Sequence, residues 1–355
     1  MSETRTVKSG GKVRAARLTD LAALGELSRL CQDAESSTRS LGLPVSGPPI
    51  GVFSLFRLPL GAFRPHDLMF VYEAEGRLAG LIRVERESFR DEWTIVELDG
   101  IGSSTAGDIR FRLVQQLVRE SSKRGVVRLH VACADQDGNV ELFMQAGFAR
   151  YGEEVVLYRP PERPLPAAWK DGRARSSRIR PAVPIDAVAL MRLYASATPQ
   201  PVQRLEAIRL NDWERQGGNW RVPRSSLAPI LRFADVEGFV QEAQGGGRDG
   251  TELDAFVQIG VAKEDQPHYL KVVAKPGADA ADLISFALGS IAARTGTGAG
   301  HRLRQGVLAP VRTYESPIDS RLEEAGFDTI ATVTLLMKET AVRVAEPALV
   351  PAGVR

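Results

Sequence analysis

The chain has 355 residues, 43% of them hydrophobic and 25% charged, which is enough to bury two sizeable cores. Lys and Arg number 46 against 44 Asp and Glu, so a net charge of +2 gives no general attraction for nucleic acid or a membrane. The two cysteines lie far apart and predict neither a disulfide framework nor a zinc site. No run reaches the ~18 apolar residues of a membrane span, so we expect a soluble, cytoplasmic protein. We also expect no bound metal.

The first elements are read from apolar periodicity and turn residues. Residues 1–12 are polar and predict a disordered leader. Residues 13–17 predict a strand, and a helix with Leu24 and Leu27 on its apolar face follows, capped by Thr19 or Asp20. Residues 32–66 are rich in Gly, Pro and Ser and predict a long loop, which is followed by a hairpin of strands at 68–73 and 78–84.

The most informative stretch runs from residue 92 to residue 148. It predicts a strand at 93–98, a Gly- and Ser-rich loop at 100–107, an amphipathic helix capped by Asp108, a strand at 126–132 and a short helix closing on Gly147-Phe148. The first N–H groups of a helix lack internal partners, and the helix dipole adds partial positive charge there. Strand, loop and helix together predict an anion cradle for a phosphate or pyrophosphate.

A second half echoes the first. Residues 159–166 are proline-rich and predict a linker over 160–177. Beyond it, residues 180–186 resemble residues 14–20, strands at 255–261 and 268–273 repeat an earlier pair, and Gly326-Phe327 repeats the Gly-Phe ending. The final strands correspond as well, 154–158 with 333–337. Because the matched elements keep their order, we infer an internal repeat, with a tail at 341–355.

This pattern resembles the GCN5-related N-acetyltransferase (GNAT) family. The resemblance rests on Glu97 in the strand, on the loop and helix from Gly100 to Glu120, and on residues 139–148 ending in Gly147-Phe148. It covers 13–159 and 178–340 and implies two tandem GNAT-like acyl-CoA N-acyltransferase domains. Each would be a mixed α/β (α+β) fold whose bent sheet splays where acetyl-CoA inserts.

The resemblance also implies site residues. Acetyl-CoA, as a co-substrate, would lie along the strand end, the loop and the helix start, in contact with Leu98, Gly100, Gly102, Thr105, Ala106, Gly107, Ile109, Arg110 and Arg112. Glu97 would be the general base for the acceptor amine, although half-exposed strand carboxylates are also common without any catalytic role. Arg110 and Arg112 would bind CoA phosphates, or alternatively be solvated arginines on a helix face.

The sequence departs from the family at the same places. Asp108 and Arg110 stand where glycines are expected, and Asp279 and Asp282 bring two acids to the equivalent place in the second half. Phe143 replaces the tyrosine that protonates the leaving thiolate in the family. An aspartate at a helix start repels a phosphate, so both sites depart from the pattern, the second more strongly.

Other side chains with chemical potential are read as structural. His130 alternates with apolar neighbours on a strand and has no partner nearby in sequence, so we interpret it as a core histidine. Cys133 is interpreted as a small buried residue, and Tyr151 and Tyr158 as strand-packing residues.

Two functional hypotheses follow. The first is an acetyl-CoA-dependent N-acetyltransferase, active in the N-terminal half, whose acceptor is the amine of an unknown small molecule or peptide. The second is a non-catalytic tandem GNAT-fold protein that serves as a binding or interaction module. In either case we expect no nucleic acid or membrane partner and a monomer or homodimer.

Overall fold

The computed structural model describes residues 11–33, 67–87, 90–101, 106–135, 138–166, 178–214, 222–244, 252–263, 266–296 and 302–340. We call the part up to residue 166 the N-terminal half and the part from residue 178 the C-terminal half. Residues 1–10 of the predicted leader, most of the loop at 32–66, Gly102, Thr105, most of the linker and the predicted tail lie outside the described residues. Lys12, the last residue of the predicted leader, already belongs to the first strand.

The N-terminal half follows the order predicted from the sequence. Its elements are β1 (Lys12–Ala15), η1 (Leu18–Asp20), α1 (Leu21–Asp33), β2 (Asp67–Ala74), β3 (Arg77–Arg86), β4 (Glu92–Gly100), α2 (Ala106–Lys123), β5 (Arg128–Cys133), α3 (Asn139–Gln145) and β6 (Ala149–Arg159). The predicted hairpin is confirmed as β2 and β3, which pair antiparallel and turn at Glu75 and Gly76.

The C-terminal half repeats this order and adds two short helices. Its elements are β7 (Ile179–Pro181), η6 (Pro184–Asp186), α4 (Ala187–Ala197), α5 (Gln200–Glu206), α6 (Leu210–Glu214), β8 (Phe233–Glu242), β9 (Leu253–Ala262), β10 (His268–Ala274), α7 (Ala281–Thr295), β11 (Val307–Arg312), η7 (Thr313–Glu315), α8 (Ser316–Glu324) and β12 (Asp328–Glu339). The sequence predicted neither β8 nor β11 as a separate strand.

The internal repeat is confirmed at the level of single hydrogen bonds. The Arg14 guanidinium binds Asp20 at 2.7 and 2.9 Å and Glu73 at 2.6 Å, and the Asp20 carboxylate also accepts the Arg17 N–H. In the second half Arg180 binds Asp186 at 2.8 and 2.9 Å and Glu242 at 2.7 Å. The same ionic cluster therefore ties the first strand of each half to the first turn of its helix.

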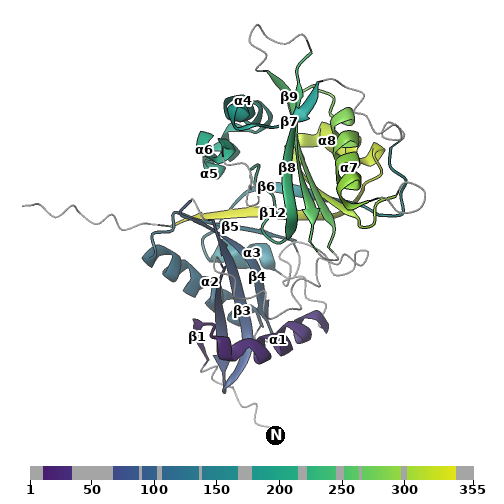
Figure 1. Cartoon of the computed structure of the whole chain (residues 1–355). Coiled ribbons are helices and arrows are strands. Elements are labelled where there is room, and N and C mark those ends of the chain that lie inside the picture. Colours follow the sequence, from purple (N-terminus) through teal and green to yellow (C-terminus); the bar gives the residue numbers. More distant parts are fainter. Residues whose placement is uncertain are drawn as a thin grey trace, which may run out of the picture.

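All twelve strands form one sheet that crosses both halves, in the order β1-β2-β3-β4-β5-β12-β6-β11-β10-β9-β8-β7. The last strand of each half is inserted into the other half. β12 lies between β5 and β6, and β6 lies between β12 and β11, with antiparallel pairing in each case. In Figure 1 yellow β12 runs beside blue β5 at the junction of the two halves. The halves thus exchange strands, and the predicted boundary at 160–177 does not divide the sheet.

Helices cover both faces of this sheet. In the C-terminal half α7 and α8 lie on one face and α4 to α6 on the other (Figure 1). In the N-terminal half α2 and α3 pack over one apolar cluster, while α1 packs over a second, smaller one. No described helix is long and apolar enough to cross a membrane.

A fifth apolar cluster joins the halves. Val96 of β4 and Val156 of β6 pack there against residues 227–231, which precede β8 in the C-terminal half. This cluster places a C-terminal segment directly against the strand that the sequence marks as functional.

Candidate functional site

β4 carries a bulge at the point where it leaves its parallel neighbour. Glu97 pairs with Arg83 and Ile95 pairs with Val84, so Val96 has no partner on β3. On the other side, β4 pairs with β5 only as far as Ile95 and Val131, and the remainder of β4 diverges from β5. A bulge leaves backbone groups unpaired and bends its strand. The predicted splay therefore occurs in the N-terminal half, and Val96 marks its position.

A cavity of about 50 Å³ lies at this divergence, and we call it the Val96 cavity. Residues 94–96 of β4, residues 130–132 of β5 and Tyr151 of β6 form one part of its wall. Residues 224–226 and 228–230, together with Arg312 of β11, form the other part. The C-terminal half therefore builds much of a cavity that opens at the N-terminal bulge.

His130 lines this cavity and is buried. Its Nε2 lies 3.1 Å from a carboxylate oxygen of Glu92, while its Nδ1 has no hydrogen-bond partner among the described residues. Burial and the charge of Arg224 lower the pKa of His130, so the imidazole is neutral at pH 7. Since a carboxylate accepts the Nε2 proton, Nδ1 carries the lone pair.

Glu92 is ionised in this setting. Burial raises the pKa of Glu92, but the His130 hydrogen bond and the Arg224 and Arg90 charges outweigh it and bring the pKa to about 2. Arg90 lies 3.0 Å from the carboxylate, and Arg224 also forms an ion pair with it. The Glu92 carboxylate therefore orients His130 without itself titrating near neutrality.

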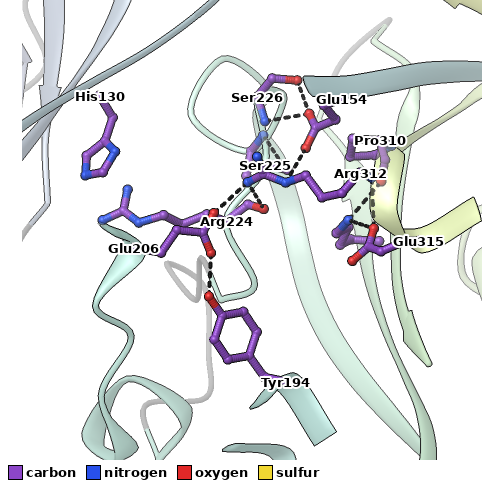
Figure 2. Close-up of polar contacts among 12 residues, drawn as sticks. His130, Glu154, Tyr194, Glu206, Arg224, Ser225, Ser226, Pro310, Arg312 and Glu315 are labelled. Carbon is purple, nitrogen blue, oxygen red and sulfur yellow. Dashed lines mark hydrogen bonds and ion pairs between the residues drawn. The ribbon is translucent and has the colours of Figure 1, made fainter. Parts of the chain in front are cut away.

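Two arginines of the C-terminal half enter the cavity wall. Arg224 binds both carboxylate oxygens of Glu87, at 2.7 and 3.0 Å, and thereby ties the segment before β8 to the end of β3. Figure 2 shows Arg312 between Glu154 and Glu206, with nitrogen-to-oxygen distances of 3.3 and 2.8 Å. Both arginines keep a donor without a hydrogen-bond partner among the described residues, Nε of Arg224 and Nη1 of Arg312.

Tyr151 completes the polar lining. Burial raises the pKa of Tyr151 to about 12, so the phenol keeps its proton at neutral pH. The guanidinium carbon of Arg312 lies 5.9 Å from the ring centroid, within the range of a cation–π contact. Tyr151 is therefore a cavity residue as well as a strand residue.

The residues predicted to bind acetyl-CoA gather around the end of β4 and the start of α2. Leu98 and Ile109 have buried side chains in the apolar cluster under α2, which leaves only their backbone for a ligand. Gly100 ends β4 close to α2, since a Cβ there would lie 3.0 Å from the Ala106 carbonyl oxygen. Ala106 and Gly107 begin the helix, and a Cβ on Gly107 would meet nothing within 4 Å.

The charged residues of α2 differ from their prediction. Asp108 is not the helix cap, because α2 begins at Ala106 and the Asp108 carboxylate pairs with Arg112 at 2.9 Å. Arg112 partly offsets the acid that the sequence placed against a phosphate. Arg110 is buried, and its Nη1 donates to the Asn139 side chain at 2.7 Å. Of the two arginines predicted to bind phosphates, only Arg112 is solvated, and both have protein partners.

Glu97, the predicted base, lies on β4 one residue beyond the bulge. Its carboxylate is 2.9 Å from Nε of Arg83, and both side chains are buried. Glu97 does not line the Val96 cavity as the described residues define it. The structure therefore brings Glu97 near the splay but engages its carboxylate with Arg83.

In the C-terminal half β10 also leaves its parallel neighbour, since it pairs with β11 only at His268 and Tyr269, but the two strands remain bridged there. β10 pairs with β9 through six consecutive residues without a bulge. Buried Lys271 reaches from β10 to the Pro310 carbonyl oxygen of β11 at 3.2 Å and to Glu315 at 2.7 Å, which bridges the two strands. The Asp279 carboxylate accepts the Ala281 N–H at 3.0 Å, so the start of α7 already has an anion.

Sequence reasoning missed most of the cavity. His130 and Tyr151 were read as packing residues, and Arg224 and Arg312 were not considered. Their side-chain partners are at least 38 residues away in sequence, too far for any local pattern. The available indication was charge at positions within otherwise apolar strands, such as Glu154 in β6, because a buried charge requires a partner. Cys133 was read correctly: it is buried, and burial raises the pKa of its thiol to about 12.

Metal ligands do not cluster in the described part of the chain, where no group of three or more His, Cys, Asp or Glu side chains is placed to hold an ion. The polar side chains around the Val96 cavity are instead paired with one another.

Comparison with known proteins identifies the fold. The sequence matches no protein-family model and no curated protein. Among solved structures, a tandem GNAT protein from the clavulanic acid biosynthesis pathway aligns with 93% of this chain and 99% of its own, at a TM-score of 0.55 and 13% identity. The chain has the tandem GNAT fold. A GCN5-related N-acetyltransferase from Sphaerobacter thermophilus covers 94% of this chain and 97% of its own, with a TM-score of 0.52 and 15% identity.

The tandem GNAT fold accounts for the order of elements that the two halves share. Both halves place a helix after a strand that leaves its parallel neighbour, which is the arrangement expected from the sequence. Of these two described strands, β4 carries a bulge, whereas β10 has none and is bridged to β11 by Lys271.

Proposed function

We propose that the N-terminal half transfers an acetyl group from acetyl-CoA to an amine that binds in the Val96 cavity. The observation that carries the proposal is the bulge at Val96, which opens β4 away from β5 directly beside a cavity with polar walls. Unpaired backbone groups at a bulge are available to a ligand that lies along the strand. In the described part of the C-terminal half, β10 also leaves β11, but it has no bulge there and Lys271 bridges the two strands.

The end of β4 and the start of α2 fit an acyl-CoA. The backbone beyond Val96 has no partner on β5, and the first turn of α2 offers N–H groups and the positive end of the helix dipole. Arg112, one turn further along α2, adds a solvated positive charge, although it is paired with Asp108. Acetyl-CoA, when bound, would supply the activated acyl carbon.

The side chain best placed as general base is His130. It lines the cavity, is neutral, and has an unpartnered Nδ1 while Glu92 holds the other ring nitrogen. Glu97 remains the alternative, but its carboxylate is engaged by Arg83 and it does not line the cavity. The nitrogen of the acceptor amine would bond to the acyl carbon while Nδ1 of His130 takes the amine proton. The carbon–sulfur bond would then break, and CoA would leave as its thiolate.

A calorimetric titration of the full chain with acetyl-CoA tests binding. We expect a dissociation constant in the micromolar range, which corresponds to a binding free energy of about −8 kcal/mol. Thiol release in the presence of primary amines then tests transfer. His130→Gln should lower the transfer rate by about 10²–10⁴-fold without loss of acetyl-CoA binding, and Glu97→Gln serves as the matched comparison. A larger loss in the Glu97 variant would reverse the two assignments.

A second candidate function is a non-catalytic binding or interaction module. The observation that favours it is the apolar packing of Leu227, Ala228 and Ile230 against Val96, which fills part of the opening with the protein's own chain. This candidate predicts no heat and no thermal shift at millimolar acetyl-CoA. That result would also refute the transferase proposal.

A further inference from the structure

The wall that the C-terminal half contributes to the Val96 cavity has a distinct chemistry. Arg312 is 3% exposed, with Nε beside Glu154 and Nη2 donating to Glu206 and to the Arg224 carbonyl oxygen. Its Nη1 has no hydrogen-bond partner in the described part of the chain. A buried guanidinium nitrogen left without an acceptor is costly, which makes Nη1 a ready donor to a ligand.

A second unpartnered donor belongs to the same wall. Nε of Arg224 is buried and has no described acceptor, although the other two nitrogens of this guanidinium bind Glu87 and Glu92. Two arginines with a spare donor therefore line one small cavity. Arginine donors are geometrically and electrostatically best matched to a carboxylate.

The other polar groups of the cavity suit an amine. Glu87 brings a carboxylate, and His130 brings a neutral ring with a lone pair on Nδ1. The lining carries one negative charge, from Glu87, and two positive charges, from Arg224 and Arg312. Outside the lining, Glu92 pairs with Arg224, and Glu154 and Glu206 pair with Arg312. Because charges of both signs face or flank the cavity, a ligand that itself carries both signs is favoured over a simple anion or a simple cation.

We propose that the Val96 cavity binds the head group of an amino acid or a similar amino-carboxylate. The C-terminal half holds the carboxylate through Arg312 and Arg224, and the N-terminal half holds the amine beside His130. The proposal rests on the transferase function proposed for the same cavity and gives the C-terminal half the role of acceptor recognition. At about 50 Å³ the cavity has room for several water molecules, which suits a head group with the rest of the acceptor outside.

The test compares each of the twenty common amino acids with its decarboxylated amine, for example L-alanine with ethylamine. Calorimetry on the full chain without acetyl-CoA gives the affinities, and thiol release with acetyl-CoA gives transfer. We expect at least one amino acid to bind about tenfold more tightly than its amine, as expected for a charge-assisted pair with arginine. Equal affinity within every pair, or no binding by any amino acid, would overturn the proposal.

Variants assign the preference to the wall. Arg312→Lys keeps the charge but loses the forked donors, and it should reduce the preference to less than about threefold. Arg159→Lys is the matched control, because Arg159 is also a buried arginine at the strand junction but does not line the cavity. If Arg312→Lys folds and still prefers amino acids over their amines as strongly as the wild type, the role of Arg312 is refuted. If this variant does not fold, the comparison of amino acids with amines on the wild-type protein still tests the proposal.

The two proposals fail in different ways. Amino-acid binding without any thiol release would leave the binding site intact and refute the transferase. Thiol release with amines that lack a carboxylate, at rates equal to those with amino acids, would support the transferase and refute the amino-carboxylate head group.

Discussion

The exchange of last strands predicts that neither half is stable by itself. Two fragments, residues 1–168 and residues 176–355, can be expressed separately. Each fragment then lacks the strand that the other supplies. Without β12, β6 has no contact with β5 and the N-terminal sheet ends at β5. An unpaired apolar edge of this kind is prone to aggregation.

The size of the effect follows from the side chains that β12 buries. Val333, Leu335, Leu336 and Met337 are each at most 4% exposed. Full burial of such a side chain contributes about 1.5–3 kcal/mol, so the four together contribute about 6–12 kcal/mol as an upper estimate. Whole domains are stable by only about 5–15 kcal/mol. Loss of the strand is therefore sufficient to unfold the N-terminal half.

The assay is thermal unfolding followed by circular dichroism, with size-exclusion chromatography to detect aggregates. We expect each fragment alone to be aggregated or to show no cooperative transition, and the co-expressed pair to regain the transition of the full chain. The control is the full chain cleaved at a protease site inserted in the linker, which retains both exchanged strands. Cooperative unfolding of isolated residues 1–168, with the acetyl-CoA affinity of the full chain, would refute the reasoning.

Three further predictions concern single side chains. Gly80→Ala should lower the free energy of unfolding by about 1–3 kcal/mol, because its Cβ would lie 2.5 Å from an Ile109 methyl carbon. Gly107→Ala should leave this free energy unchanged or raise it by up to about 1 kcal/mol, because it favours the helical conformation of α2. Urea unfolding measures both variants. Lys271→Met should lower the free energy of unfolding by about 3–5 kcal/mol, because it leaves the Glu315 carboxylate buried and unpaired. Adding Glu315→Gln to this variant should recover part of the loss. Equal stabilities of the single and the double variant would contradict the pairing argument. Burial lowers the pKa of His268 to about 4, so the unfolded chain takes up a proton on this residue at a higher pH than the folded chain does. About 3 kcal/mol of stability is therefore lost as the pH falls from 6.5 to 4. His268→Asn should flatten that part of the stability profile, and an unchanged slope would show that the loss arises elsewhere.

The sequence by itself determined the local elements and their repetition. Apolar periodicity located α2, the Glu75-Gly76 turn located the first hairpin, and the spacing of Arg14 and Asp20 recurred in Arg180 and Asp186. These features depend on neighbours in the chain, where periodicity and turn chemistry act directly. That local order was enough to indicate two GNAT-like halves.

Only the tertiary structure decided which strand lies beside which and what lines the cavity. β6 and β12 occupy equivalent positions at the ends of the two halves, and both are apolar in their C-terminal part, so the sequence pattern does not decide between pairing within a half and pairing across halves. Arg224 and Arg312 acquire meaning only because strand exchange brings the C-terminal half against the Val96 bulge. Local patterns fix the direction of a side chain along its own strand, but burial of charge selects partners across the whole chain, and those partners are set by packing.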